Sequence, residues 1–202
     1  MKLVASLTSP YARKIRVALA EKGLPFTLEV DIPWLPETTV PSYNPLGKVP
    51  ALVGDDGEVW YDSPVIALYL ETLGGIPLLP AERTASLPVR QTEALADGIA
   101  DAAVAAFLES RRPPEQQDAA GIERQLAKIH RGLATLEERL AQRKGFGGSS
   151  LNIGDIAVGC MLGYLDFRFA HLHWRSTHPT LAAWAADLMA RPSFVDTVPP
   201  PA

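Results

Sequence analysis

The chain has 202 residues, of which 47% are hydrophobic, and this is enough to bury the core of one large domain or two small domains. Its formal net charge of −4 leaves no basic excess to neutralise phosphates, so a nucleic-acid partner is not expected. No apolar run approaches the roughly 18 residues that span a bilayer, and a single cysteine excludes an intramolecular disulfide, so we expect a soluble, cytoplasmic protein without membrane association.

A serine followed by a proline opens the first predicted helix. Ser9 is a favoured N-cap residue, Pro10 is favoured at the first helical position, and Lys22 followed by Gly23 is typical of a helix end. The spacing therefore predicts a helix over residues 10–22, whose cations form a local face, after a short strand at Leu3–Ala5. The helix amides beside Ser9 favour an anion such as a thiolate. A simple helix cap is the alternative role for Ser9.

Three further strands are expected before residue 62. Phe26, Leu28 and Val30 alternate with polar residues, which predicts a half-buried strand. Segments 49–53 and 58–61 flank a Gly-Asp-Asp-Gly turn and predict a hairpin. Pro50 cannot donate a hydrogen bond to a sheet, so its place at the start of a strand indicates an edge or a special backbone geometry. A cis bond before Pro50 would leave the backbone of Val49 pointing out of the sheet.

A second serine-proline pair predicts the next helix, with Ser63 as the N-cap and Pro64 at the first helical position. The apolar positions expected along it are Val65, Ile66, Tyr69, Leu70 and Leu73. The first part of the chain thus reads as a strand-helix-strand unit followed by two strands and a helix.

The composition changes at residues 74–80, and the remainder is predicted to be helical. Helices are expected over residues 85–111, 115–143 and 153–170, with a flexible loop at 145–150. The second of these helices has a single apolar seam for bundle packing, formed by Ile122, Leu126, Ile129, Leu133, Leu136 and Leu140.

The last of these helices is apolar on nearly all sides and is predicted to be the buried central helix. Asn152 and Asp155 open it with a variant of the capping box, so Asp155 is assigned to folding rather than catalysis. Cys160 is interpreted as a small buried hydrophobic residue and not as a reactive thiol. The four histidines lack the spacing of a metal site, and no metal is expected.

Four motifs occur in order: S-P-Y-x-R-K from residue 9, N-P-x-G-K-V-P from residue 44, D-S-P-V-I from residue 62 and N-x-x-D from residue 152. Together they resemble the cytosolic glutathione transferase superfamily, over essentially the whole chain. The resemblance implies an α/β plus all-α fold, with a thioredoxin-like N-terminal domain at 1–76, a linker at 77–82 and a helical-bundle C-terminal domain at 83–202. It also implies glutathione as co-substrate and a homodimer.

The resemblance further implies roles for single residues. Ser9 would donate to the glutathione sulfur, the Val49 backbone before a cis Pro50 would pair with the cysteinyl group, and Asp62 and Ser63 would hold the γ-glutamyl end. Helix capping alone is the alternative for Asp62 and Ser63. Two neighbouring positions have alternatives of their own. Lys48 is expected either near the glycine carboxylate or in solvent. The hydroxyls of Ser6 and Thr8 are alternatives to Ser9 as the donor.

The expected activity is conjugation of the glutathione thiolate to electrophilic carbon of small apolar substrates. The candidate walls of the second-substrate site are Tyr11, Trp34, Phe107 and Tyr164, with ordinary core packing as the alternative for each. The alternatives are a non-catalytic glutathione-binding or adaptor protein, or a glutathione-dependent isomerase or peroxidase.

Two positions depart from the family pattern. Many relatives have glutamate at the position of Asp62, which puts the affinity for glutathione in question. Relatives that act through a mixed disulfide have cysteine at the position of Ser9, so that chemistry is disfavoured here.

Overall fold

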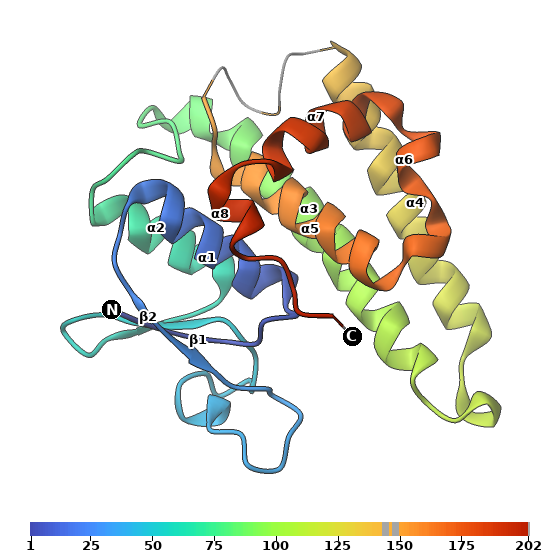
Figure 1. Cartoon of the computed structure of the whole chain (residues 1–202), viewed down its shortest axis with the longest axis horizontal. Helices are drawn as coiled ribbons and strands as arrows, with labels where there is room; N and C mark the ends of the chain where they lie inside the picture. Colours follow the sequence, from blue (N-terminus) through green and yellow to red (C-terminus); the bar gives the residue numbers. More distant parts are fainter. Residues whose placement is uncertain (143–145, 147–149, 202) are drawn as a thin grey trace.

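The computed structural model describes residues 1–142, 146 and 150–201. A small sheet with two helices comes first in the chain, and a larger group of helices packs beside it (Figure 1). None of the helices among the described residues is long and apolar enough to cross a membrane.

The sheet contains four strands in the order β2-β1-β3-β4. Their bounds are β1 (Lys2–Ala5), β2 (Thr27–Val30), β3 (Ala51–Val53) and β4 (Val59–Trp60), with a 3-10 turn η1 (Val40–Ser42) before β3. Strand β1 pairs in parallel with β2 and antiparallel with β3, and β3 pairs antiparallel with β4. Helix α1 (Pro10–Lys22) connects β1 to β2, and α2 (Ser63–Thr72) follows β4. This order confirms the predicted thioredoxin-like arrangement.

Local signals set the start of α1 as predicted, whereas β3 begins at Ala51, two residues after the predicted strand start at Val49. The Ser9 hydroxyl accepts a hydrogen bond of 3.2 Å from the Ala12 amide, and Gly23, with a φ of 68°, ends the helix. The Val49–Pro50 peptide bond is cis, and β3 begins at the next residue.

Two predictions for this part need correction. Leu28 and Val30 on β2 are exposed, Val30 to 53%, because β2 is the edge strand of the sheet. Helix α2 has Asp62 and not Ser63 at its N-cap position, so Ser63 is the first helical residue. The start of this helix was therefore predicted one residue late.

Helices make up the second part. Their bounds are α3 (Arg83–Ser110), η2 (Pro114–Gln116), α4 (Ala119–Gln142), α5 (Ile153–Arg168), η3 (Ala170–Leu172), α6 (Trp174–Thr177), α7 (Pro179–Met189) and α8 (Pro192–Val195). The apolar seam of α4 faces the core as predicted. The predicted helix start at residue 115 is wrong, because a 3-10 turn separates α3 from α4. Arg143 and most of the predicted loop 145–150 lie outside the described residues.

Helix α5 lies at the centre of the molecule, between α3 and α1 (Figure 1). Twelve of its sixteen residues are buried, and the Asn152–Asp155 capping box is present at its start, as predicted. The helix ends at Arg168 rather than near residue 170.

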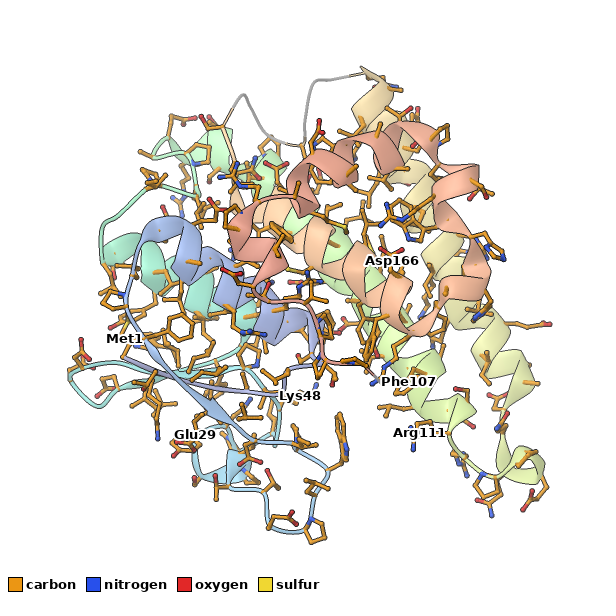
Figure 2. All side chains as sticks on the ribbon, viewed as in Figure 1. Met1, Glu29, Lys48, Phe107, Arg111 and Asp166 are labelled. Atoms are coloured by element: carbon orange, nitrogen blue, oxygen red, sulfur yellow. The ribbon has the colours of Figure 1, made fainter. Side chains whose placement is uncertain are left out.

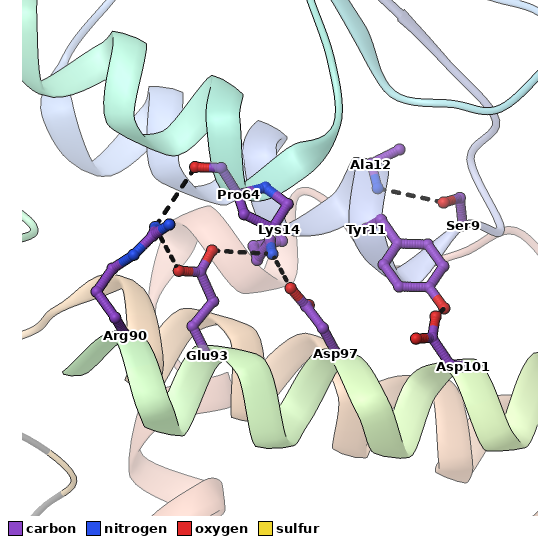
Figure 3. Close-up of polar contacts among 9 residues, drawn as sticks. All are labelled: Ser9, Tyr11, Ala12, Lys14, Pro64, Arg90, Glu93, Asp97 and Asp101. Atoms are coloured by element: carbon purple, nitrogen blue, oxygen red, sulfur yellow. Dashed lines mark hydrogen bonds and ion pairs between the residues drawn. The ribbon is translucent and has the colours of Figure 1, made fainter. Parts of the chain in front are cut away.

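The first helix contributes cations of its predicted local face to the contact between the two parts. Lys14 is buried against α3, where its ammonium group pairs with Glu93 and Asp97 (Figure 3). Arg13 is buried against the C-terminal segment and donates a hydrogen bond of 3.0 Å to the Phe194 carbonyl. These contacts fix α1 against the helical part of the chain.

Candidate active site

A cleft of about 500 Å³ lies between the sheet and the helical part. One wall comes from the segment after β1, the turns before β3 and the start of α2, and the other comes from α3 and α5 (Figure 2). All of the candidate residues from the sequence line it: Ser9, Tyr11, Trp34, Lys48, Val49, Pro50, Asp62, Ser63, Phe107 and Tyr164. The structure thus brings together residues that are far apart in the chain.

Ser9 stands at the positive end of α1. Its hydroxyl oxygen accepts from the Ala12 amide, which leaves the hydroxyl proton for a group in the cleft. The hydroxyls of Ser6 and Thr8 lie 3.2 Å apart and hydrogen-bond to each other. Of these three hydroxyls, only that of Ser9 accepts from an amide of α1, so Ser9 stays the predicted donor.

The turn before Val49 is held by a buried asparagine. The Asn44 side-chain amide donates to the Lys48 carbonyl at 2.9 Å, and its oxygen accepts from the Leu46 amide at 3.0 Å. Gly47 takes a φ of 62°, which favours glycine at that place. Pairing of β3 with β1 begins only at Ala51, so Val49 lies at the cleft outside the ladder.

The start of α2 forms the third element of this wall. Ser63 is buried and Asp62 is exposed. The Asp62 side chain makes no capping hydrogen bond, although the residue occupies the N-cap position. Its carboxylate therefore does not serve the helix, which weakens the alternative that Asp62 is only a cap. The free amides at this helix start suit a carboxylate.

Tyr11, in the first turn of α1, contacts α3 on the opposite wall of the cleft. Its hydroxyl donates a hydrogen bond of 2.5 Å to Asp101 (Figure 3). Burial, and then the hydrogen bond to Asp101, raise the pKa of the Tyr11 phenol far above its ordinary value. The phenol therefore stays protonated and acts as a donor.

The predicted aromatic walls differ in burial. Trp34 is 66% exposed, so core packing does not explain its place at the cleft. Tyr164 is buried and Phe107 is half-buried, and both also pack against the helical core. Each of these two residues therefore both lines the cleft and packs in the helical core.

Several wall residues on α3 and α5 were not predicted from the sequence. They are Asp101, Val104, Ala105, Leu108 and Arg168. The first four share one helical face at spacings of three and four, and Arg168 lies one turn after Tyr164. Helical spacing was the signal available in the sequence, but it does not say which face of α3 meets the sheet.

Neither an activated cysteine nor, among the described residues, a cluster of metal ligands accompanies the cleft. Cys160 is buried on α5 outside the cleft, and burial raises the pKa of its thiol to about 12, so it is not an activated nucleophile. Within the part of the chain that the structure describes, no three His, Cys, Asp or Glu side chains are grouped to hold a metal ion.

Comparison with known proteins identifies the scaffold. A family model described as the N-terminal domain of glutathione S-transferase matches residues 8–73, and one described as the C-terminal domain matches residues 119–187. The protein named uncharacterized GST-like protein YibF, from Escherichia coli (strain K12), is 42% identical over 203 residues and covers 100% of both chains. The chain belongs to the glutathione S-transferase family.

Solved structures of glutathione S-transferases give the same result. One from Methylobacillus flagellatus KT, with glutathione bound, is 49% identical with a TM-score of 0.95, over 98% of this chain and 99% of that chain. One from Methylobacterium radiotolerans JCM 2831, in complex with glutathione sulfonate, is 45% identical with a TM-score of 0.93. The likeness covers 98% of this chain and 94% of that chain. These likenesses confirm the fold of a glutathione S-transferase.

The family models do not cover the whole cleft. Ser9, Val49 and Asp62 fall within the matched N-terminal region, whereas Asp101 and Phe107 fall between the two matched regions. In this glutathione S-transferase family member, the α3 wall is therefore the part of the cleft that the family models leave undescribed.

Proposed function

We propose that this glutathione S-transferase family member binds glutathione along the sheet-side wall of the cleft and conjugates its thiolate to electrophilic carbon. The second substrate is small and apolar, and it occupies the side toward α3 and α5. The observation that carries the proposal is the convergence of Ser9, Val49, Asp62 and Ser63 on one wall. Bound glutathione and glutathione sulfonate in the two solved relatives support it.

Each part of glutathione has a chemical match on this wall. The Val49 backbone offers an amide and a carbonyl to the cysteinyl group, beside the cis bond to Pro50. The free carboxylate of Asp62 suits the γ-glutamyl ammonium, and the Ser63 hydroxyl with the α2 amides suits its carboxylate. Lys48, which is exposed, suits the glycine carboxylate.

Ser9 would stabilise the thiolate. Lowering a thiol pKa from about 8.5 to about 6.5 needs roughly 2.7 kcal/mol of preference for the charged form. A helix N-terminus contributes about 0.3–1 kcal/mol, and up to about 2 kcal/mol where the site is partly buried. A hydrogen bond from a hydroxyl to a charged group adds about 1.5–3 kcal/mol. These two effects together reach the required size without a metal or a general base.

The test is an ultraviolet difference spectrum of the protein on addition of glutathione, followed across pH. We expect a thiolate band that persists at neutral pH, because the bound thiol is ionised there. Absence of the band, with calorimetric binding intact, would count against the thiolate mechanism and favour the binding or adaptor alternative.

Product analysis then separates the reaction classes. A conjugate found by mass spectrometry after incubation with 1-chloro-2,4-dinitrobenzene supports the transferase. Turnover without consumption of glutathione would indicate an isomerase, and oxidised glutathione formed from a hydroperoxide would indicate a peroxidase.

We further propose that the protein acts in the cytoplasm as a homodimer. Reduced glutathione is maintained in the cytosol, and a chain with one buried cysteine suits a reducing compartment. The dimer rests on the family expectation alone, and light scattering during size-exclusion chromatography measures it directly.

A further inference from the structure

The helical wall of the cleft carries an arginine with a buried donor that has no hydrogen-bond partner. Arg168 is the last residue of α5 and lines the cleft. Its Nε is buried and has no hydrogen-bond partner. Within the described residues its guanidinium forms no ion pair, whereas the nearby carboxylate of Asp166 pairs with Arg175. A buried donor without an acceptor is costly and needs an explanation.

Stacking fixes the orientation of this guanidinium. Its centre lies 4.5 Å from the Phe107 ring centroid and 3.9 Å from the Phe167 ring centroid. The donors of a guanidinium project from its edge, in its own plane, so contact with aromatic rings leaves them available. That edge matches the two oxygens of a carboxylate.

The other charged residues of the cleft, Lys48, Asp62 and Asp101, have a partner in the structure or are assigned one by the proposed function. Asp101 accepts from Tyr11. Lys48 and Asp62 are taken by glutathione under the proposed function. A titratable neighbour of Arg168 is Tyr164. Burial raises the pKa of its phenol, and the charge of the guanidinium, together with a side-chain hydrogen bond from it, partly offsets that rise. Asp101 keeps its negative charge, because its donor is a neutral phenol, but among the described residues no hydrogen bond or ion pair joins it to Arg168.

We propose that Arg168 binds a carboxylate of the second substrate. The preferred electrophile then combines an apolar body, which packs against Phe107 and Leu108, with a carboxylate at the end remote from the reacting carbon. Leu108 is 50% exposed and offers apolar surface beside this position. The inference rests on the proposed function, because that function places the thiolate on the opposite wall.

Calorimetric titration with conjugates tests the proposal without depending on turnover. The probes are glutathione, S-benzylglutathione and S-(4-carboxybenzyl)glutathione. We expect the native protein to bind the carboxylated conjugate about ten-fold or more tightly than the neutral one, as a hydrogen bond to a charged group predicts. Arg168→Met should abolish this preference and leave glutathione affinity unchanged. Arg168→Lys should retain part of it, because lysine keeps the charge but loses the bidentate fork.

Arg111→Met is the matched control. Arg111 also lies over the Phe107 ring, at 5.8 Å, but it is exposed and outside the cleft lining, so its replacement should leave the preference intact. Glutathione affinity that falls as much as conjugate affinity in Arg168→Met would assign the arginine to the glycine carboxylate instead and overturn the proposal.

Two further outcomes are distinguishable. Equal binding of the two conjugates by the native protein would overturn the role of Arg168 and leave the proposed function standing. Failure of all three probes to bind would overturn the proposed function, and this inference with it.

Discussion

The ammonium group of Lys14 lies 3.0 Å from a carboxylate oxygen of Glu93, and the two side chains are only 1% and 2% exposed. The same ammonium lies 2.6 Å from Asp97, and Arg90 pairs with the other Glu93 oxygen at 2.7 Å (Figure 3). Burial raises the pKa of both the Glu93 and Asp97 carboxyls, and Lys14 opposes that rise. This network joins α1 to α3, and so fixes the two walls of the cleft relative to each other.

Lys14→Met should therefore destabilise the protein severely. Removing one partner of a buried ion pair leaves the remaining charge uncompensated, at a typical cost of about 3–5 kcal/mol. The free energy of unfolding in urea measures the loss. Lys2→Met is the matched control, because Lys2 pairs with Glu29 at 2.8 Å with both side chains about one-third exposed. Its effect should be much smaller.

A second variant keeps this prediction testable if Lys14→Met does not fold. Lys14→Met combined with Asp97→Asn removes the carboxylate charge that the first variant leaves without an ion-pair partner, since Glu93 keeps its pair with Arg90. We expect the double variant to regain part of the lost stability. Equal stability of Lys14→Met and the native protein would contradict the role given to this network.

Ser9→Ala should remove most turnover without removing glutathione binding. A single donor to a developing or resting anion typically contributes about 100-fold or more to kcat. We expect a loss of about this size with an electrophile such as 1-chloro-2,4-dinitrobenzene, and glutathione affinity within a few-fold by calorimetry. Loss of the N-cap should also lower the free energy of unfolding by about 1 kcal/mol.

Thr8→Ala is the control for Ser9→Ala, because it removes a neighbouring hydroxyl that is already bonded to Ser6. Its turnover should stay close to that of the native protein. Unchanged turnover in Ser9→Ala, or a larger loss in Thr8→Ala, would exclude Ser9 as the donor to sulfur.

Signals that act over a few residues allowed much of this structure to be predicted. The Ser9-Pro10 pair predicted the start of α1, and the Asn152–Asp155 pair predicted the start of α5, because capping is a contact between near neighbours. Predicting which residues form the sheet-side wall of the cleft also required the family motifs, because Ser9 and Asp62 come together only in the folded chain.

Contacts between distant residues could not be predicted in the same way. Lys14 was predicted only as part of a local cationic face, and its partner Glu93 lies 79 positions later on α3. The Tyr11–Asp101 hydrogen bond and the place of Arg168 depend likewise on how α3 and α5 pack against the sheet. Periodicity identifies an apolar face but does not identify its partner.

Gly159→Ala should destabilise the packing of α5. A Cβ at this glycine would lie 2.7 Å from both Leu188 and the Phe194 ring. This distance is shorter than two non-bonded carbon atoms can approach. Overpacking of this kind typically costs about 1–3 kcal/mol. Gly98→Ala on α3 is the control, because nothing lies within 4 Å of its Cβ, and alanine should stabilise that helix by about 0.5–1 kcal/mol. Opposite shifts in Tm are expected, and a stabilised Gly159→Ala would show that α5 packs less tightly.

Asp155 should make stability fall as pH rises from about 4 to about 6. Burial raises the pKa of its carboxyl from 3.8 to about 6, against the hydrogen bonds that Asn152 donates to it. The folded state therefore holds the proton at pH values where the unfolded state has released it. The stabilisation is complete below the ordinary pKa and is lost as pH rises through about 6, at most about 3 kcal/mol in all.

Asp155→Asn tests this dependence because it keeps the shape of the side chain and cannot titrate. Denaturant unfolding of both proteins at several pH values should show the native protein losing stability relative to Asp155→Asn as pH rises through this range. Asp118→Asn serves as the control of opposite sign. Asp118 accepts a hydrogen bond from the Gly121 amide, which holds its pKa below the ordinary value, so its contribution is lost as pH falls. Parallel pH profiles for the native protein and Asp155→Asn would show that the Asp155 carboxyl titrates alike in the folded and unfolded states.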